Sequence, residues 1–155
     1  MKFIQKWIAI FLLVAVAALY SCESGPKFSE VSGKEWLLVE VKTQAETIPF
    51  NRKTLVSDGF KNIFTLKFDA ERVSGVGAPN NYTAPFTLDK KQAIAIKPMA
   101  GTMMAPIREP EKLKEHDYFV YLQNTYKWNL VNGKLELYTK NGSGEEATLV
   151  YELGK

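Results

Sequence analysis

The chain has 155 residues, of which 24% are charged and 46% hydrophobic, the size and composition of one folded domain. Its formal net charge is +3 at pH 7, and it falls to +1 without residues 1–21, which hold two lysines and no acid. This near-balance argues against a nucleic-acid partner, because recognition of a phosphate backbone needs a concentrated basic surface. One Cys and one His exclude most metal and redox chemistry, so we expect no cofactor and no metal site.

Residues 1–21 are typical of an export signal. A short segment with two lysines precedes an apolar stretch of 13 residues (7–19), whereas a membrane-spanning helix needs about 20. The stretch ends in Leu-Tyr-Ser-Cys at 19–22, which resembles the bacterial lipoprotein cleavage box, although Tyr20 is larger than the residue usual at its position. The resemblance implies cleavage before Cys22, a diacylglycerol on its thiol and a further acyl chain such as palmitate on the new amino terminus.

An alternative is ordinary cleavage at the Ala-Val-Ala of residues 15–17, which would release a soluble protein with a free thiol. The cysteine count favours lipidation, because an exported chain with one Cys has no intramolecular disulfide partner. We therefore expect a protein of the bacterial cell envelope that is bound to membrane lipid through acylated Cys22. The sequence does not decide which membrane or leaflet receives it.

The segment after the signal, residues 22–33, is polar and interrupted by Gly and Pro, which predicts a flexible tether before a domain at 34–155. Strand patterns begin at 36–41 and continue at 63–68, followed by a tight reversal at 69–72. In the first strand Leu37, Val39 and Val41 are expected to share one face, while Trp36 and Leu38 make the other face largely apolar too. In the second strand the side chains expected to point inward are Phe64, Leu66 and Phe68.

Further strands are expected at 92–97 and in the last 28 residues. Asn132-Gly133 separates two alternating stretches and predicts a type I′ hairpin, since Asn and Gly tolerate the positive φ that this turn needs. Apolar residues at every second position from Ala147 to Leu153 mark the last strand. One helix is expected at about 110–126, with Pro110 near its first position. The pattern predicts an α+β domain, an antiparallel sheet curled into a small sandwich or partly closed barrel with one helix.

Several short motifs recur in a known order along this domain. They are a Trp in the opening strand, a Ser-Gly pair and an Asn after a hairpin, a Thr-x-Met-Ala segment, and a helical Glu seven residues before a Leu. The residues concerned are Trp36, Ser74, Gly75, Asn80, Thr102, Met103, Met104, Ala105, Glu115 and Leu122. In these features the chain resembles the META domain family, also called HslJ-like. The resemblance implies a small α+β domain, frequent in bacterial envelope lipoproteins, with no established enzymatic activity.

The chain departs from that family where many members carry two cysteines. Those places hold Pro79 and Pro106, so the disulfide that the family pattern suggests is ruled out here. Because proline fixes φ, the two residues are expected to restrict their loops instead.

Candidate binding residues lie in two loops and at the helix. Amide, aromatic and thioether side chains suit adaptable recognition, and the resemblance adds the Thr and the Glu. The candidates are Asn80, Asn81, Tyr82, Thr102, Met103, Met104 and Glu115. For these two methionines and Met99, the favoured interpretation is that they fill irregular gaps in the core. Gly75-Val76-Gly77 lacks the third Gly of a dinucleotide fingerprint and is expected to be a bulge or a tight turn.

No catalytic residue is predicted. His116, the only His, has the right pKa range for a general base, but no nucleophile motif accompanies it, and a residue at the edge of the core is the favoured interpretation. The leading hypothesis is a membrane-anchored, non-enzymatic envelope domain that binds an envelope protein or has a structural role in envelope maintenance or stress. The alternative is a carrier or chaperone for a small apolar ligand or lipid, enclosed by strands that are apolar on both faces. A hydrolase that uses His116 with Ser74 is the weakest of the three.

Overall fold

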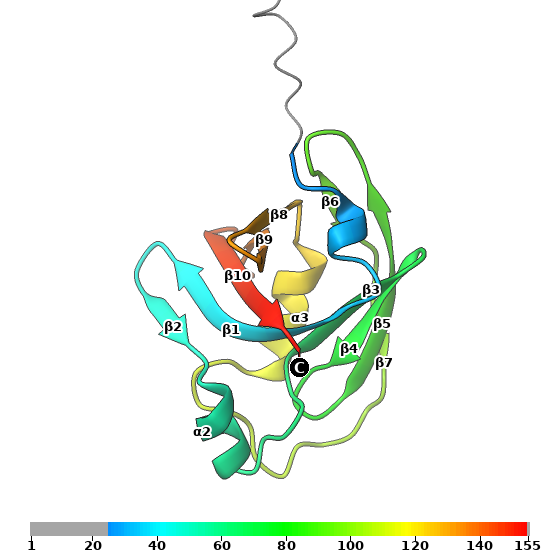
Figure 1. Cartoon of the computed structure of the whole chain (residues 1–155). Helices are drawn as coiled ribbons and strands as arrows, with labels where there is room; N and C mark the ends of the chain where they lie inside the picture. The colour runs from blue at the N-terminus through cyan, green and yellow to red at the C-terminus, as the bar shows by residue number, and fades with distance from the viewer. Residues whose placement is uncertain (1–24, 155) are drawn as a thin grey trace, which may run out of the picture.

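A computed structural model describes residues 25–154 of the chain (Figure 1). The expected signal peptide and Cys22 lie outside the described residues. The helical elements are η2 (Phe28–Glu30), α2 (Arg52–Ser57) and α3 (Glu115–Gln123). The strands are β1 (Glu35–Thr43), β2 (Thr47–Pro49), β3 (Thr65–Asp69), β4 (Arg72–Val76), β5 (Asn81–Leu88), β6 (Ile94–Ile96), β7 (Ala100–Gly101), β8 (Lys127–Val131), β9 (Lys134–Lys140) and β10 (Glu146–Leu153). Within 25–154, no helix is long and apolar enough to cross a membrane.

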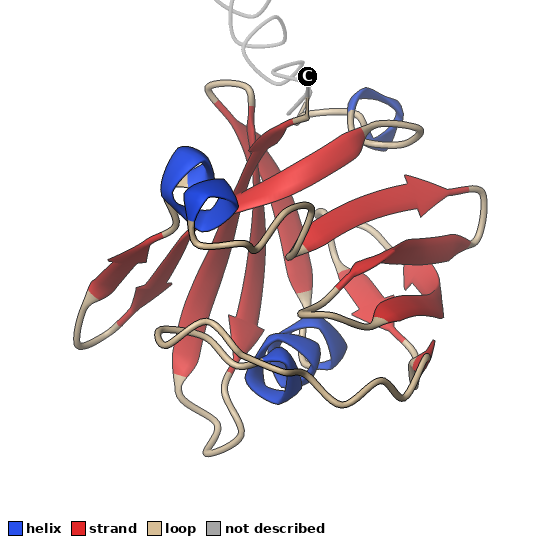
Figure 2. Ribbon diagram, turned by 90° about the horizontal axis from the view of Figure 1, so that it is seen from below, coloured by secondary structure: helices blue, strands red, loops and turns tan. Residues whose placement is uncertain are grey.

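The strands form one antiparallel sheet in the order β6-β5-β4-β3-β1-β10-β9-β8, with β2 added beside β1 and β7 beside β5. The sheet curls until its two ends meet. There the bridge between Ala93 and Lys127 forms, with Ile94 N–H donating to Tyr126 O (3.1 Å) and Trp128 N–H donating to Gln92 O (3.0 Å). Seen from below, the strands splay into two groups and α3 lies in the opening between them (Figure 2). The predicted α+β class is confirmed, in the form of a nearly closed barrel with one seam.

Large side chains fill the interior of the barrel. Trp36, Phe64, Phe68, Tyr118 and Tyr151 are each almost completely buried, and Phe68 packs edge-on against Phe86 with ring centroids 5.0 Å apart. Burial of this much aromatic surface is the main stabilising contribution to the fold. Because these rings occupy the space between the strands, the interior does not support the carrier hypothesis, which needs room for a ligand.

In β1 the residues Leu37, Val39 and Val41 do not share one face, although the period-two pattern predicted that they would. Trp36 and Leu38 are buried and Leu37 and Val39 are only half-buried, yet Val41 is buried again. The pairing of β1 with β10 shifts register between Leu38 and Glu40, and a bulge of this kind moves the following side chains to the other face of the strand. The prediction for Phe64, Leu66 and Phe68 is confirmed, as all three are fully buried.

Two of the turns predicted from the sequence are confirmed, and both contain residues with positive φ. Asn132 and Gly133 have φ values of 51° and 76° between β8 and β9, as the type I′ hairpin requires. The reversal expected at 69–72 joins β3 to β4, with Ala70 at φ 45°.

The N-terminal segment of the described chain is packed, in contrast to the flexible tether expected at 22–33. Val31 is fully buried, and its carbonyl oxygen accepts the indole N–H of Trp36 at 3.0 Å. Phe28 contacts three rings, those of Phe68, Phe86 and Trp128, at centroid distances of 5.2, 5.5 and 5.1 Å. This apolar contact outweighs the polar composition of the segment, so residues 28–33 belong to the domain.

The main helix is shorter than predicted, since α3 begins at Glu115 and ends at Gln123 rather than spanning 110–126. Pro110 is buried in an irregular stretch before it. Proline is compatible with a first helical position but does not force a helix to begin. The sequence also left residues 43–61 without an assignment, and there the structure forms β2 and α2. Asn51 caps α2 by accepting the backbone N–H groups of Lys53 (3.0 Å) and Thr54 (3.2 Å).

Three buried tyrosine hydroxyls meet inside the barrel around one backbone carbonyl. Tyr82 donates to Thr65 O at 2.7 Å, Tyr118 donates to the same oxygen at 3.2 Å, and Tyr151 donates to the Tyr118 hydroxyl at 3.2 Å. Burial raises the pKa of Tyr118 to about 12, and burial also raises the pKa values of Tyr82 and Tyr151 well above the usual range. We call these three side chains the tyrosine cluster.

The tyrosine cluster predicts unfolding in alkali. In the unfolded chain a tyrosine ionises near pH 10, whereas in the folded protein it resists ionisation, so stability is intact below about pH 10 and is lost as the pH rises toward 12. Each buried tyrosine contributes up to about 1.4 kcal/mol per pH unit in that window. Absorbance at 295 nm and far-UV circular dichroism should change together, and Tyr118→Phe should make the loss of stability with pH about one third less steep. Full ionisation near pH 10 with unchanged circular dichroism would contradict the prediction.

Candidate functional site

The first residue of α3, Glu115, is buried and holds the loop between β4 and β5. One carboxylate oxygen, Oε1, accepts the backbone N–H groups of Ala78 (2.5 Å) and Asn80 (2.6 Å), and Oε2 accepts the side-chain amide of Asn80 (2.7 Å). A carboxylate can be buried at acceptable cost when several N–H groups donate to it in this way.

Gly77 permits this close approach of the loop to the helix. A Cβ at residue 77 would lie 2.5 Å from Glu115 Oε1 and 2.7 Å from the ring of Phe119. The sequence predicted a bulge or turn at Gly75-Val76-Gly77, and the structure shows instead that both glycines are places where other groups come very near the backbone. A dinucleotide site has no support there.

Asn80 connects the same loop to the segment after β7. Its Oδ1 accepts the Thr102 hydroxyl (2.7 Å) and the Met104 backbone N–H (2.7 Å), and its Nδ2 donates to Met104 O (3.0 Å). The Thr102 hydroxyl oxygen in turn accepts the backbone N–H of Asn81 at 3.2 Å. We call the network of Asn80, Asn81, Thr102, Met104 and Glu115 the loop clamp.

The structure thus brings five of the seven candidate residues together, but in a different role from the one expected. Asn80 is 5% exposed and its polar atoms are satisfied within the clamp, so it does not present a contact surface. Tyr82 is buried in the tyrosine cluster. Met103 is 98% exposed and Met104 is half exposed, so of the methionines considered only the partly buried Met99 packs against the core.

His116 lies exposed on α3, next to the clamp in sequence but outside its hydrogen bonds. Among residues 25–154, no group of three or more His, Cys, Asp or Glu side chains is arranged to hold a metal ion.

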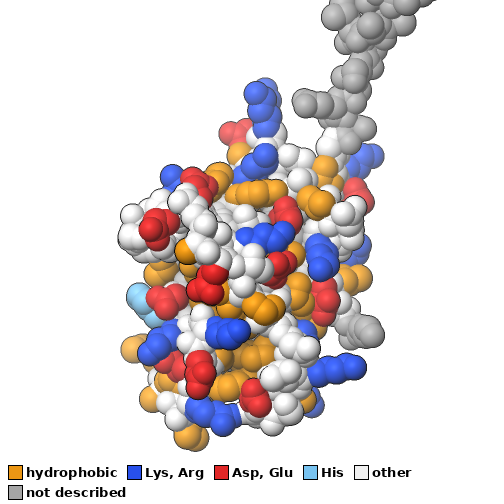
Figure 3. Space-filling view, turned by 90° about the vertical axis from the view of Figure 1, so that its left-hand side faces the viewer, with side chains coloured by type: hydrophobic (Ala, Val, Ile, Leu, Met, Phe, Trp, Pro, Cys, Tyr) orange, Lys and Arg blue, Asp and Glu red, His pale blue; other side chains and the backbone are white. Residues whose placement is uncertain are grey.

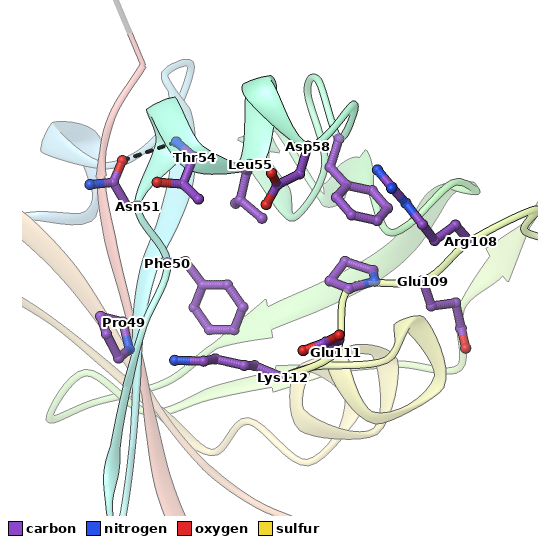
Figure 4. A pocket seen from close by; sticks show the side chains of 12 residues that line it. Pro49, Phe50, Asn51, Thr54, Leu55, Asp58, Arg108, Glu109, Glu111 and Lys112 are labelled. Atoms are coloured by element: carbon purple, nitrogen blue, oxygen red, sulfur yellow. Dashed lines mark hydrogen bonds between the residues drawn. The ribbon is translucent and has the colours of Figure 1, made fainter.

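A cleft of about 630 Å³ lies at the end of the domain that carries α2. One wall is α2 with the turn after it, and the other is the irregular stretch before α3 (Figure 4). The lining residues are Pro49, Phe50, Asn51, Thr54, Leu55, Asp58, Phe60, Arg108, Glu109, Pro110, Glu111 and Lys112. Phe50 lies between the walls, and the Arg108 guanidinium sits 4.7 Å from the centre of the Phe60 ring, which joins the two walls at one end.

Charged side chains surround the apolar residues Phe50, Leu55 and Phe60, which form the floor of the cleft. Asp58 and Glu111 project toward the cleft from opposite walls, while Glu109 points away from it (Figure 4). Glu109 lies 3.8 Å from Lys114, whereas neither Asp58 nor Glu111 has an ion-pair partner within 4 Å among the described residues. The cleft therefore combines an aromatic and aliphatic floor with two carboxylates that are free to meet a cation.

Sequence reasoning missed the cleft entirely. Seven of its twelve lining residues come from 49–60, which had no assignment, and the other five from 108–112, where the expected helix was to begin. The one available signal was Asn51 as a helix N-cap, but a helix of six residues gives too short a pattern to recognise.

Residues 29–150, more than half of the chain, match the META domain family. The chain belongs to the META domain family. The motif residues Trp36, Asn80, Thr102 and Glu115 all lie inside the matched range. No curated protein matches the chain.

Two solved structures share the fold of this META domain. A protein from Burkholderia xenovorans, solved by NMR, superposes with a TM-score of 0.60 at 16% identity, over 82% of this chain and 86% of its own. A DUF4847 family protein from Bacteroides vulgatus superposes with a TM-score of 0.54 at 14% identity, over 81% of this chain and 95% of its own. At these identities the likeness shows a common fold and carries no function across.

Proposed function

We propose that this META domain protein is a non-enzymatic binding module of the bacterial envelope, held at a membrane by lipid on Cys22, with the α2 cleft as its binding surface. The observation that carries the proposal is that the N-terminal segment and the cleft lie at opposite ends of the domain. The η2 segment lies in the upper part of Figure 1, whereas α2 and the cleft lie at the lower end. An anchor before η2 therefore leaves the cleft directed away from the membrane.

The packing of Phe28 limits the length of chain between Cys22 and the folded domain. Six residue steps separate Cys22 from Phe28, and a fully extended chain of that length reaches only about 20 Å. Phe28 is held against three rings of the barrel, so it cannot lengthen the connection without losing that contact. The domain would stand close to its membrane in a restricted range of orientations.

Two further observations support binding rather than catalysis or transport. The hydroxyls of the tyrosine cluster and the carboxylate of Glu115 are buried and satisfied by hydrogen bonds, so they do not face a substrate. Buried aromatic side chains of the described residues occupy the barrel interior, which favours the cleft as the place where a ligand binds.

Anchoring is tested by fractionating cells that express the full chain. We expect wild-type protein in the membrane fraction with incorporated fatty acid, and we expect Cys22→Ala to lose the label and leave the membrane. Ser24→Ala, a matched change two residues away, should behave as wild type. A Cys22→Ala protein that stays on the membrane, or a wild-type mass showing cleavage after Ala17, would overturn the anchoring proposal.

A further inference from the structure

Exposed apolar side chains adjoin the cleft in sequence. Ile107, directly before the lining residue Arg108, is fully exposed, and Val56, which follows the lining residue Leu55 on α2, is 53% exposed. Figure 3 shows hydrophobic side chains gathered between charged ones on the lower half of the face that carries α2. Exposed apolar side chains beside a cleft that is lined by charged and aromatic residues are typical of a protein-binding site.

The charge of the lining indicates what the partner carries. Three acids (Asp58, Glu109, Glu111) and two bases (Arg108, Lys112) line the cleft. Glu109 is held by Lys114 and the charge of Arg108 faces the Phe60 ring, which leaves the carboxylates of Asp58 and Glu111 and the ammonium of Lys112 for a ligand. The available charge is therefore net negative and is concentrated on two facing walls.

An arginine fits this arrangement better than a lysine. Its planar guanidinium can donate to carboxylates on two sides at once and can stack on an aromatic ring. Phe50 lies between the two walls that carry Asp58 and Glu111, so a guanidinium that stacks on its ring is attracted by the carboxylates of both walls (Figure 4). Large apolar side chains next to that arginine would cover Leu55 and the exposed Ile107.

We propose that the α2 cleft binds a segment of a partner protein in which an arginine has large apolar neighbours. This inference rests on the proposed function, since it names the partner class of the same binding surface. Its test does not depend on the anchor, so the two can fail separately.

The probe is the peptide Ala-Leu-Phe-Arg-Ala-amide with a neutral fluorophore on its amino terminus. It is titrated with the full chain, in nanodiscs of neutral phosphatidylcholine if the chain is lipidated and in solution if it is not, with empty nanodiscs subtracted. We expect saturable binding at or below 1 mM. Asp58→Asn combined with Glu111→Gln should weaken it about fivefold, and 0.5 M NaCl should do the same, because exposed ion pairs are screened. Replacing Arg by Glu in the peptide, or Leu-Phe by Ser-Ser, should remove measurable binding.

A matched pair of variants on α2 locates the site. Thr54 lines the cleft and Ser57 does not, and both are exposed. Thr54→Arg should weaken binding at least tenfold by filling the cleft and neutralising its charge, whereas Ser57→Arg adds the same group outside and should stay within twofold of wild type. Equal loss in the two variants, or no binding of the Arg peptide, would overturn the proposed site.

Two other outcomes would also overturn the proposal. Equal binding of the Arg and Glu peptides would remove the charge argument. If light scattering shows that the nanodisc-free chain forms a dimer that Ile107→Glu dissociates, the occupant of this surface is a second copy of the chain rather than an arginine-bearing partner.

Discussion

Replacing Glu115 with Ala should cost about 3 to 5 kcal/mol of the free energy of unfolding. The change removes the acceptor for three N–H donors, from the backbone of Ala78 and from the backbone and side chain of Asn80. A buried donor left without a partner costs about 1 to 3 kcal/mol, and the effect is larger when the lost partner was charged. Urea unfolding followed by tryptophan fluorescence measures the loss.

Two companion variants separate the clamp from the helix. Asp117→Asn removes an exposed carboxylate from the same first turn of α3 and should cost less than about 1 kcal/mol, the value of a helix-dipole interaction. Glu115→Gln keeps one acceptor oxygen but turns an amide N–H₂ toward another donor. Its loss of stability should therefore lie between those of Glu115→Ala and Asp117→Asn. Amide exchange of Ala78 and Asn80 should accelerate in Glu115→Ala alone. Equal losses in Glu115→Ala and Asp117→Asn would show that the clamp does not stabilise the fold.

The clamp also shows which parts of the fold could be predicted from the sequence. The hairpin at Asn132-Gly133 and the inner face of β3 depend on a few neighbouring residues, and both were predicted correctly. The contact of Asn80 with Glu115 joins residues 35 positions apart. The family resemblance named both residues but gave no reason for their roles, because hydrogen bonding between distant loops leaves no periodic signal in the chain.

The errors have equally local causes. The bulge after Leu38 reversed the face of β1, since a single extra residue changes a period-two pattern. Phe28 was assigned to a tether because the polar residues around it hide one aromatic side chain that packs on three others. The cleft depends on how a six-residue helix faces a proline-containing loop, which neither segment encodes alone.

Gly75→Ala should be at least as damaging as the loss of the clamp, about 3 kcal/mol or more. A Cβ at residue 75 would lie 2.1 Å from the carbonyl oxygen of Thr65 and 2.8 Å from the Tyr82 hydroxyl. Real side chains do not approach a backbone oxygen so closely, so β3 and β4 would have to separate here. That oxygen accepts the hydroxyls of Tyr82 and Tyr118, so the movement would also disturb the tyrosine cluster.

Gly142→Ala is the matched control, because a Cβ there would meet only Val120 at 4.0 Å, an ordinary contact. We expect its unfolding midpoint in urea to match that of wild type, while Gly75→Ala shifts to much lower urea or fails to fold. A surviving Gly75→Ala protein should also ionise its buried tyrosines at lower pH, since water would reach the cluster. If the free energy of unfolding of Gly75→Ala lies within 1 kcal/mol of the wild-type value, β3 and β4 can separate at little cost. The close approach of these two strands would then not be what holds the three tyrosine hydroxyls together.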